Sequence, residues 1–192
     1  MLKTPLRHAM PAGIAVLLAA HPAAAMQFTL LELPGNHPAI AARGVVVPGD
    51  FHRLLDFCNS LDNVRRIAGL VLDSPGGSVL EAEKIAGAVR DMKLTVAVPD
   101  GATCASACFL IFAASPDRIA APDAHIGVHR ASLAGHETEG SLAATDGMQV
   151  AIQHWGVPAA VVTKMTETAA GGVTWLTPSD LAAMHVTSTR AK

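Results

Sequence analysis

The stretch that most constrains the fold of this chain runs from Cys104 to Ala114, with the sequence CASACFLIFAA. A turn of small residues carrying Ser106 leads directly into an apolar run of helical length. At a helix N-terminus, unpaired backbone N–H groups and the helix dipole favour negative charge. Ser106 is therefore either an N-cap, the common role of a serine in front of a helix, or a nucleophile whose substrate develops an oxyanion.

Composition limits the other possibilities. The chain has 192 residues, which suits one domain with a substantial core. About half of the residues are apolar and only 16% are charged, so a disordered chain is excluded. The net charge of −2 and the absence of a Lys/Arg cluster argue against a nucleic-acid partner.

The N-terminus has the pattern of a secretory signal peptide. Lys3 and Arg7 precede an apolar stretch, 9–20, which is followed by HPAAA. We expect cleavage after Ala25, which gives a signal peptide over 1–25 and a single domain over 26–192 that is periplasmic or secreted. An uncleaved membrane anchor remains the alternative reading of this segment.

Export bears on the three cysteines, because an oxidising compartment permits disulfides. Cys104 and Cys108 flank Ser106 and are four residues apart, about one helical turn. Their spacing is compatible with a disulfide that braces the turn, and buried free thiols are the alternative. Cys58 is left over. No CxxC pair or HExxH motif is present, so we expect no metal site.

Hydrophobic patterning predicts alternating strands and helices. Continuous apolarity favours strands covered on both faces, and the β-α-β-α-β-α-β order favours an α/β layered fold with parallel strands. Asp50 is the predicted N-cap of the first helix, and Ser78 with Glu81 forms the predicted capping box of the second. The expected strands are 43–48, 67–73, 94–98 and one or two strands within 118–129.

The C-terminal third is predicted to be helical after a mobile surface loop. The segment 132–147 is rich in Gly, Ala, Ser and Thr, which is typical of such a loop. Helices are expected near 145–155 and 158–168. A last short helix is expected to have Pro178 at its first position and Asp180 at its third.

Three polar features follow successive predicted strands, at the edge where open α/β sheets place their sites. The first is SPGG, 74–77, whose glycines allow backbone N–H groups to approach a substrate. The second is Ser106, followed by Ala107. The third is His129, for which His125 on the same strand face is a competitor.

In this order, these motifs resemble the Clp protease proteolytic subunit and its crotonase-fold relatives, including the signal peptide peptidase A type. The motifs are SPGG, CASACFL and DRIAAPDAHIGVH, and the resemblance spans about 43–185. It implies a ClpP/crotonase-like layered fold, with repeated β-β-α and βα units around a mainly parallel sheet. It also implies Ser106 as nucleophile, His129 as general base, and an oxyanion hole from Gly77 (or Gly76) and Ala107.

The chain departs from this family at the third catalytic position. The family has an aspartate a few residues before a segment like WLTPSDL, whereas 169–174 here reads AAGGVT. Glu167 is a candidate if the glycine loop folds back, and Asp180 is a poor one because it lies inside the next helix. Without an orienting acid a histidine's tautomer is less well fixed, so a Ser-His dyad and a degenerate enzyme are both open.

These features predict an exported serine hydrolase without metal or organic cofactor, and the resemblance to the Clp family implies that it is a peptidase. Its substrates would be peptides or unfolded proteins. Self-association into a homo-oligomer is expected from the family. The segment 132–147 matches poorly the handle that joins Clp rings, and no ATPase partner is expected outside the cytoplasm. The alternative is a catalytically degenerate peptide-binding or assembly protein; acyl-CoA chemistry of the crotonase type fits less well.

Overall fold

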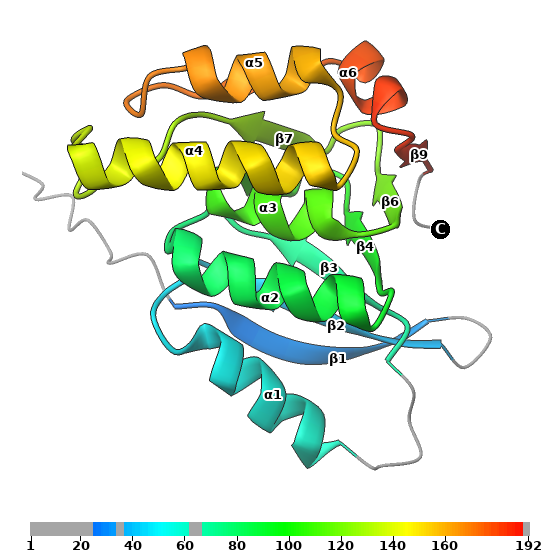
Figure 1. The fold of residues 1–192 in the computed structure, drawn as a ribbon. Helices are drawn as coiled ribbons and strands as arrows, with labels where there is room; N and C mark the ends of the chain where they lie inside the picture. Colours follow the sequence, from blue (N-terminus) through cyan, green and yellow to red (C-terminus); the bar gives the residue numbers. More distant parts are fainter. Residues whose placement is uncertain (1–24, 34–36, 62–66, 190–192) are drawn as a thin grey trace, which may run out of the picture.

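The computed structural model describes residues 25–33, 37–61 and 67–189 (Figure 1). Nearly all of the predicted signal peptide lies outside these residues. The strands are β1 Gln27–Leu33, β2 His37–Arg43, β3 Gly69–Asp73, β4 Thr95–Val98, β5 Thr103–Ala105, β6 Asp117–Ala120, β7 His125–Val128, β8 Thr174–Trp175 and β9 Thr187–Ser188. The helices are α1 Asp50–Ser60, α2 Val79–Asp91, α3 Ala107–Ala114, α4 Glu139–His154, α5 Ala159–Glu167 and α6 Pro178–Ala183.

The strands form two sheets. The larger has the order β1-β2-β3-β4-β6-β9, and every neighbouring pair in it is parallel except β1 and β2. The smaller has the order β5-β7-β8, with β5 and β7 parallel and β8 antiparallel. This arrangement confirms the predicted α/β fold with a mainly parallel sheet.

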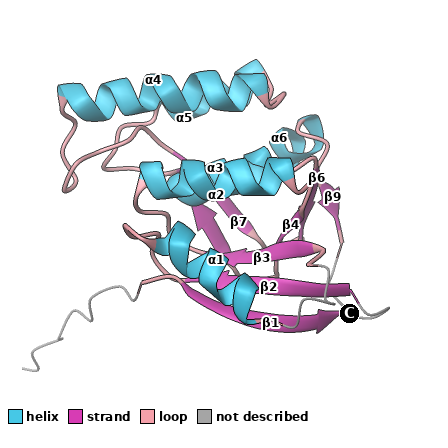
Figure 2. Ribbon diagram, turned by 60° about the horizontal axis from the view of Figure 1, so that its bottom comes forward, coloured by secondary structure: helices cyan, strands magenta, loops and turns pink. Residues whose placement is uncertain are grey.

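Helix α3 is the centre of the core. All eight of its residues are buried, and the side chains of Phe109 and Phe112 have no exposed surface. A helix that is apolar on every face has to be enclosed on every side, and α3 contacts α2, α4 and the strands β4, β5 and β7. Helices α2 and α3 lie side by side (Figure 1), and Figure 2 shows both on the same side of the strands β3 and β4. Ser106 immediately precedes this helix, so the core fixes its position.

The first predicted strand, 43–48, is wrong. The strand lies earlier, in β2, which pairs with β1 on one side and β3 on the other. Gly44, with a φ of 108°, ends it. Beyond Gly44 the chain keeps only isolated bridges, of Val45 to Ala25 and of Val46 to Gly77. The apolar run after β2 therefore leads away from the sheet toward the SPGG segment.

Two of the predicted helix caps differ in detail. Gly49, with a φ of 93°, takes the N-cap position predicted for Asp50, and the Asp50 carboxylate accepts the Val47 N–H at 2.5 Å. The Ser78 hydroxyl accepts the N–H of Glu81, as predicted. The Glu81 carboxylate, however, accepts the N–H of Phe51 at 3.0 Å rather than that of Ser78. It thereby ties α2 to α1. The last helix begins as predicted, with a Thr177–Asp180 capping box and Pro178 at its first position.

The predicted surface loop over 132–147 is wrong from Glu139 onward, because α4 begins there behind a capping box of Thr138 and Ser141. Its buried face is Ser141, Thr145, Met148 and Ile152. These residues have helical spacing, but the first two are polar, which hid the pattern from hydrophobicity alone. No helix within the described ranges is long and apolar enough to cross a membrane.

Candidate active site

Ser106 has a backbone conformation unusual for a serine. Its φ of 57° and ψ of −126° differ from the extended conformation of an ordinary N-cap, and its hydroxyl caps no N–H group of α3. The Ser106 N–H donates to the Gly127 carbonyl at 3.0 Å, which anchors the turn to β7. Non-glycine residues with positive φ are strained and concentrate at functional sites. Ser106 is partly exposed, and its hydroxyl makes no hydrogen bond within the described chain.

A disulfide brackets this turn. The sulfur atoms of Cys104 in β5 and Cys108 in α3 are 2.07 Å apart, and both residues are fully buried. The bond therefore joins the strand before Ser106 to the helix after it. Cys58 is a free, half-buried thiol in α1, and burial raises its pKa above the ordinary value.

The SPGG segment lies directly against Ser106. Ser74 pairs with β5, donating its N–H to the Thr103 carbonyl at 2.6 Å and accepting the Ala105 N–H at 3.1 Å. A Cβ atom on Gly76 would lie 2.6 Å from the Ala105 oxygen and 2.7 Å from the Cβ of Ser106. Only glycine fits there, so the two motifs are packed backbone to backbone.

The backbone N–H groups of this segment have different partners. The Gly76 N–H donates to the Ser74 hydroxyl at 3.1 Å, so this donor is already used. Within the described part of the chain, the N–H groups of Gly77 and Ala107 donate to no acceptor. The Ala107 nitrogen would be only 2.9 Å from a Cβ on Gly76, so both donors adjoin the Ser106 turn. Of the two glycine alternatives, Gly77 is the one with an available N–H.

His129 follows β7 at the same end of the small sheet as Ser106, since Ala105 and Gly127 are paired. It is partly buried, and its Nδ1 lies 2.7 Å from the Arg130 carbonyl oxygen. It makes no hydrogen bond to Ser106 in this structure. His125 lies at the other end of β7, exposed, with its ring 5.9 Å from that of Trp175. Of the two histidines, His129 therefore lies at the Ser106 end.

No hydrogen bond or ion pair joins His129 to a carboxylate among the described residues. Continuing the β7–β8 register, in which Val128 pairs with Thr174, brings Val173 opposite His129. Glu167, the weak candidate, is exposed at the last residue of α5 and makes no hydrogen bond or ion pair in the described structure. The Asp180 carboxylate accepts hydrogen bonds from the Lys164 ammonium group and the Thr177 hydroxyl.

Around His129 the structure shows a polar network that sequence reasoning missed. The Arg130 guanidinium donates to both carboxylate oxygens of Glu137, at 2.8 and 3.1 Å, and to the Thr166 carbonyl at 3.1 Å. Hydrogen bonds from Arg130 and from the Ala170 N–H lower the pKa of the Glu137 carboxyl. The Ala131 N–H donates to the Thr145 hydroxyl at 3.0 Å. No local motif joins these residues, so only the fold reveals the network.

A groove begins beside Gly77, with a cavity volume of about 300 Å³. It lies between the start of α2, the chain after β7 and the start of α4, and Leu80 and Leu133 contribute exposed apolar side chains to it.

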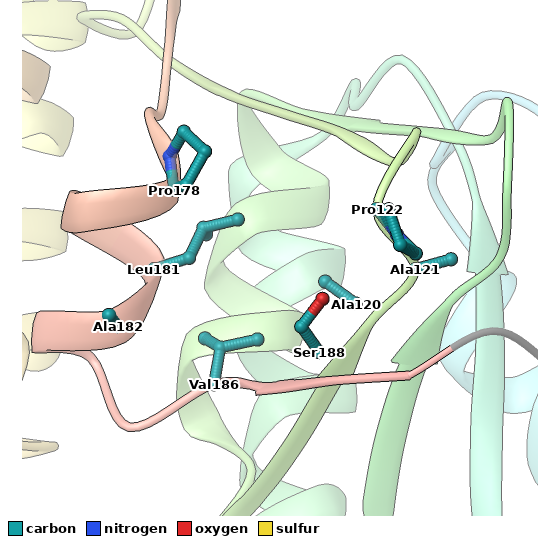
Figure 3. Close-up of a pocket in the computed structure, with 8 residues that line it drawn as sticks. All are labelled: Ala120, Ala121, Pro122, Pro178, Leu181, Ala182, Val186 and Ser188. Carbon is teal, nitrogen blue, oxygen red and sulfur yellow. The ribbon is translucent and has the colours of Figure 1, made fainter.

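A second cavity of about 290 Å³ lies between α6, β9 and the end of β6 (Figure 3). Ser188 is the one hydroxyl among its lining side chains, which are otherwise apolar, and neither Ser106 nor His129 lines it. No cluster of metal-ligating side chains occurs among the described residues.

A family model for Clp protease matches residues 51–152, more than half of the chain. The chain belongs to the Clp protease family. The matched region contains SPGG, Ser106 and His129 and stops before 169–174. No curated protein matches the chain at the level of sequence.

Solved structures agree on the fold of this family member. ClpP1 from Listeria monocytogenes is 18% identical with a TM-score of 0.57, over 80% of this chain and 92% of that one. The ClpP catalytic domain from Plasmodium falciparum is 16% identical with a TM-score of 0.57, over 77% and 82%. A mutant of the 1510-N membrane-bound stomatin-specific protease is 22% identical with a TM-score of 0.56, over 80% and 78%. At these identities the likeness establishes the ClpP-like fold.

Proposed function

We propose that this member of the Clp protease family is a serine peptidase with Ser106 as nucleophile and His129 as general base. The observation that carries the proposal is the Ser106 turn, in which a strained serine keeps its hydroxyl free at the start of a buried helix. A serine serving only as an N-cap would use that hydroxyl on the helix.

In this mechanism the Ser106 oxygen attacks a peptide carbonyl while His129 takes its proton and later returns it to the leaving amine. The N–H groups of Gly77 and Ala107 stabilise the oxyanion that forms. The groove beside Gly77 accepts the substrate, a short or unfolded peptide, and Leu80 and Leu133 favour an apolar side chain in it. The chemistry requires no metal or organic cofactor.

Export, processing and assembly are part of the same proposal. Removal of 1–25 would yield a periplasmic or secreted protein in a compartment that supports the Cys104–Cys108 disulfide. Self-association without an ATPase is the expected form of the mature chain. The alternative function, a degenerate peptide-binding protein, is favoured by the lack of a carboxylate at His129 among the described residues.

A fluorophosphonate probe distinguishes the two functions. The oxidised protein beginning at Met26 should be labelled, and Ser106→Ala and His129→Ala should both lose labelling. Ser60→Ala, which removes an exposed serine hydroxyl at the last residue of α1, is the matched control and should label normally. Mass spectrometry of the labelled peptide should locate the adduct on Ser106. A folded wild type that takes no label would refute the peptidase and favour the binding protein.

A further inference from the structure

The hydrogen bond of His129 defines which of its nitrogens carries a proton. A carbonyl oxygen only accepts hydrogen bonds, so the Nδ1 that lies 2.7 Å from the Arg130 oxygen must be the protonated nitrogen. Nε2 then has a free lone pair. This is the tautomer that a general base facing a serine requires, and a carboxylate usually selects it.

The peptide group that contains this oxygen is held on its other side. The Arg130 carbonyl and the Ala131 N–H belong to the same planar unit. That N–H donates at 3.0 Å to the hydroxyl of Thr145, which itself donates to the Ser141 carbonyl at 3.0 Å. Thr145 is 3% exposed, so no solvent competes for the Ala131 N–H. Helix α4 therefore fixes the plane in which the acceptor of His129 lies.

The rest of Arg130 is anchored to a different part of the chain. Its N–H donates to the Thr168 carbonyl at 3.0 Å, and its guanidinium binds the Glu137 carboxylate through two hydrogen bonds. Both side chains of this ion pair are less than one-third exposed. Bidentate arginine–carboxylate pairs fix geometry as well as adding energy. The acceptor is thus held from α4, from the segment before α4 and from the end of α5.

We propose that the Arg130–Ala131 peptide group, held by Thr145, orients His129 in place of the carboxylate that this chain lacks. Thr145 is then a positioning residue for the base. The inference rests on the proposed function, because it supplies the third element of the proposed Ser106–His129 pair. It adds a role for a backbone carbonyl and for a helix outside the catalytic motifs.

The test compares Thr145→Val, which keeps the shape and removes the hydroxyl, with Thr145→Ser, which keeps the hydroxyl. In fluorophosphonate labelling, the maximal rate should fall about 10- to 100-fold in Thr145→Val, as when outer partners that orient a functional histidine are lost. The probe concentration for half-maximal rate should not change. Thr145→Ser keeps the hydroxyl that accepts the Ala131 N–H and should remain within about twofold of wild type, which corresponds to about 0.4 kcal/mol. Thr95→Val, which removes a hydrogen bond to Asp117 at the far end of β4, controls for loss of a threonine hydroxyl elsewhere.

Nitrogen NMR of His129 separates this inference from the proposed function, because it reads the tautomer without activity. At about pH 9, where imidazoles are neutral, wild type and Ser106→Ala should show a protonated Nδ1, and Thr145→Val a mixture of tautomers. A protonated Nε2 in wild type would overturn the inference even if labelling succeeds. A folded Thr145→Val that labels at the wild-type rate would overturn it as well. If the wild type takes no label, the proposed peptidase function is refuted. The tautomer of His129 in the NMR spectrum would still show whether the Arg130–Ala131 peptide group orients the ring.

Discussion

Replacing Gly76 with alanine tests how closely the SPGG backbone must approach Ser106. The φ of Gly76 is +101°, a conformation that L side chains rarely adopt. The added Cβ would be 2.6 Å from the Ala105 oxygen, 2.7 Å from the Cβ of Ser106 and 2.9 Å from the Ala107 nitrogen. Two of these three atoms are backbone in a core that cannot move far, so the turn itself has to shift.

The expected size of the effect follows from two terms. Holding a non-glycine residue at such a φ costs about 1–3 kcal/mol. Overpacking a tight site costs about 1–3 kcal/mol more. The sum, about 2–6 kcal/mol, is a large part of the roughly 5–15 kcal/mol by which domains of this kind are stable. Gly147→Ala is the matched control, because Gly147 is exposed in α4 and a Cβ there meets nothing within 4 Å. It should stabilise α4 by about 0.5–1 kcal/mol.

Urea unfolding of both variants measures these free energies, and the fluorophosphonate labelling rate measures the site. Gly76→Ala should unfold at a lower urea concentration. Its folded fraction should label more slowly than wild type, because the clash falls on Ser106 and Ala107. Gly147→Ala should label normally. If Gly76→Ala unfolds and labels as wild type does, the SPGG segment does not pack against Ser106 as described.

Two further predictions concern the disulfide and the last helix. The double variant Cys104→Ser/Cys108→Ser opens a loop with a sequence separation of 4 and should lower the free energy of unfolding by about 2 kcal/mol; urea midpoints equal to those of the oxidised wild type would contradict this. For Asp180, burial raises the pKa, but hydrogen bonds from Lys164 and Thr177 outweigh it, and the pKa lies below the ordinary value of 3.8. Its contribution to stability is therefore present at neutral pH and is lost as the pH falls below about 4, because the folded state holds the proton more weakly than the unfolded state. Asp180→Asn should weaken that acid dependence in urea unfolding followed against pH, and an unchanged pH profile would refute the assignment.

The central elements β3, α2, β4 and α3 could be predicted from the sequence because their core segments are apolar, whereas β1 and the short strands β5, β8 and β9 were not predicted. The run 67–73 contains β3, and the run after Ser106 is α3, as expected. The errors occurred where local chemistry overrides hydrophobicity. Gly44 ends β2 although three valines follow it, and Ser141 with Thr145 puts polar groups on the buried face of α4.

Part of the candidate site could also be predicted, because its motifs follow predicted strands. SPGG and Ser106 are short contiguous motifs whose neighbours in space are paired strands, so their proximity follows from topology. The surroundings of His129 were not predictable, because they depend on a backbone carbonyl and on Thr145, sixteen residues away. A carbonyl is present at every residue and leaves no mark in a sequence.

The burial of α3 has a consequence for how this molecule opens. Amides in a fully enclosed helix exchange with solvent only when the whole domain unfolds, whereas exposed loops open locally at little cost. Ser106 is joined to the enclosed helix, because it directly precedes α3 and the disulfide links the residues on either side of it. His129 is followed within a few residues by the exposed segment 132–140. We therefore expect partial opening of 132–140 to detach Glu137 from the Arg130 guanidinium while Ser106 stays in place.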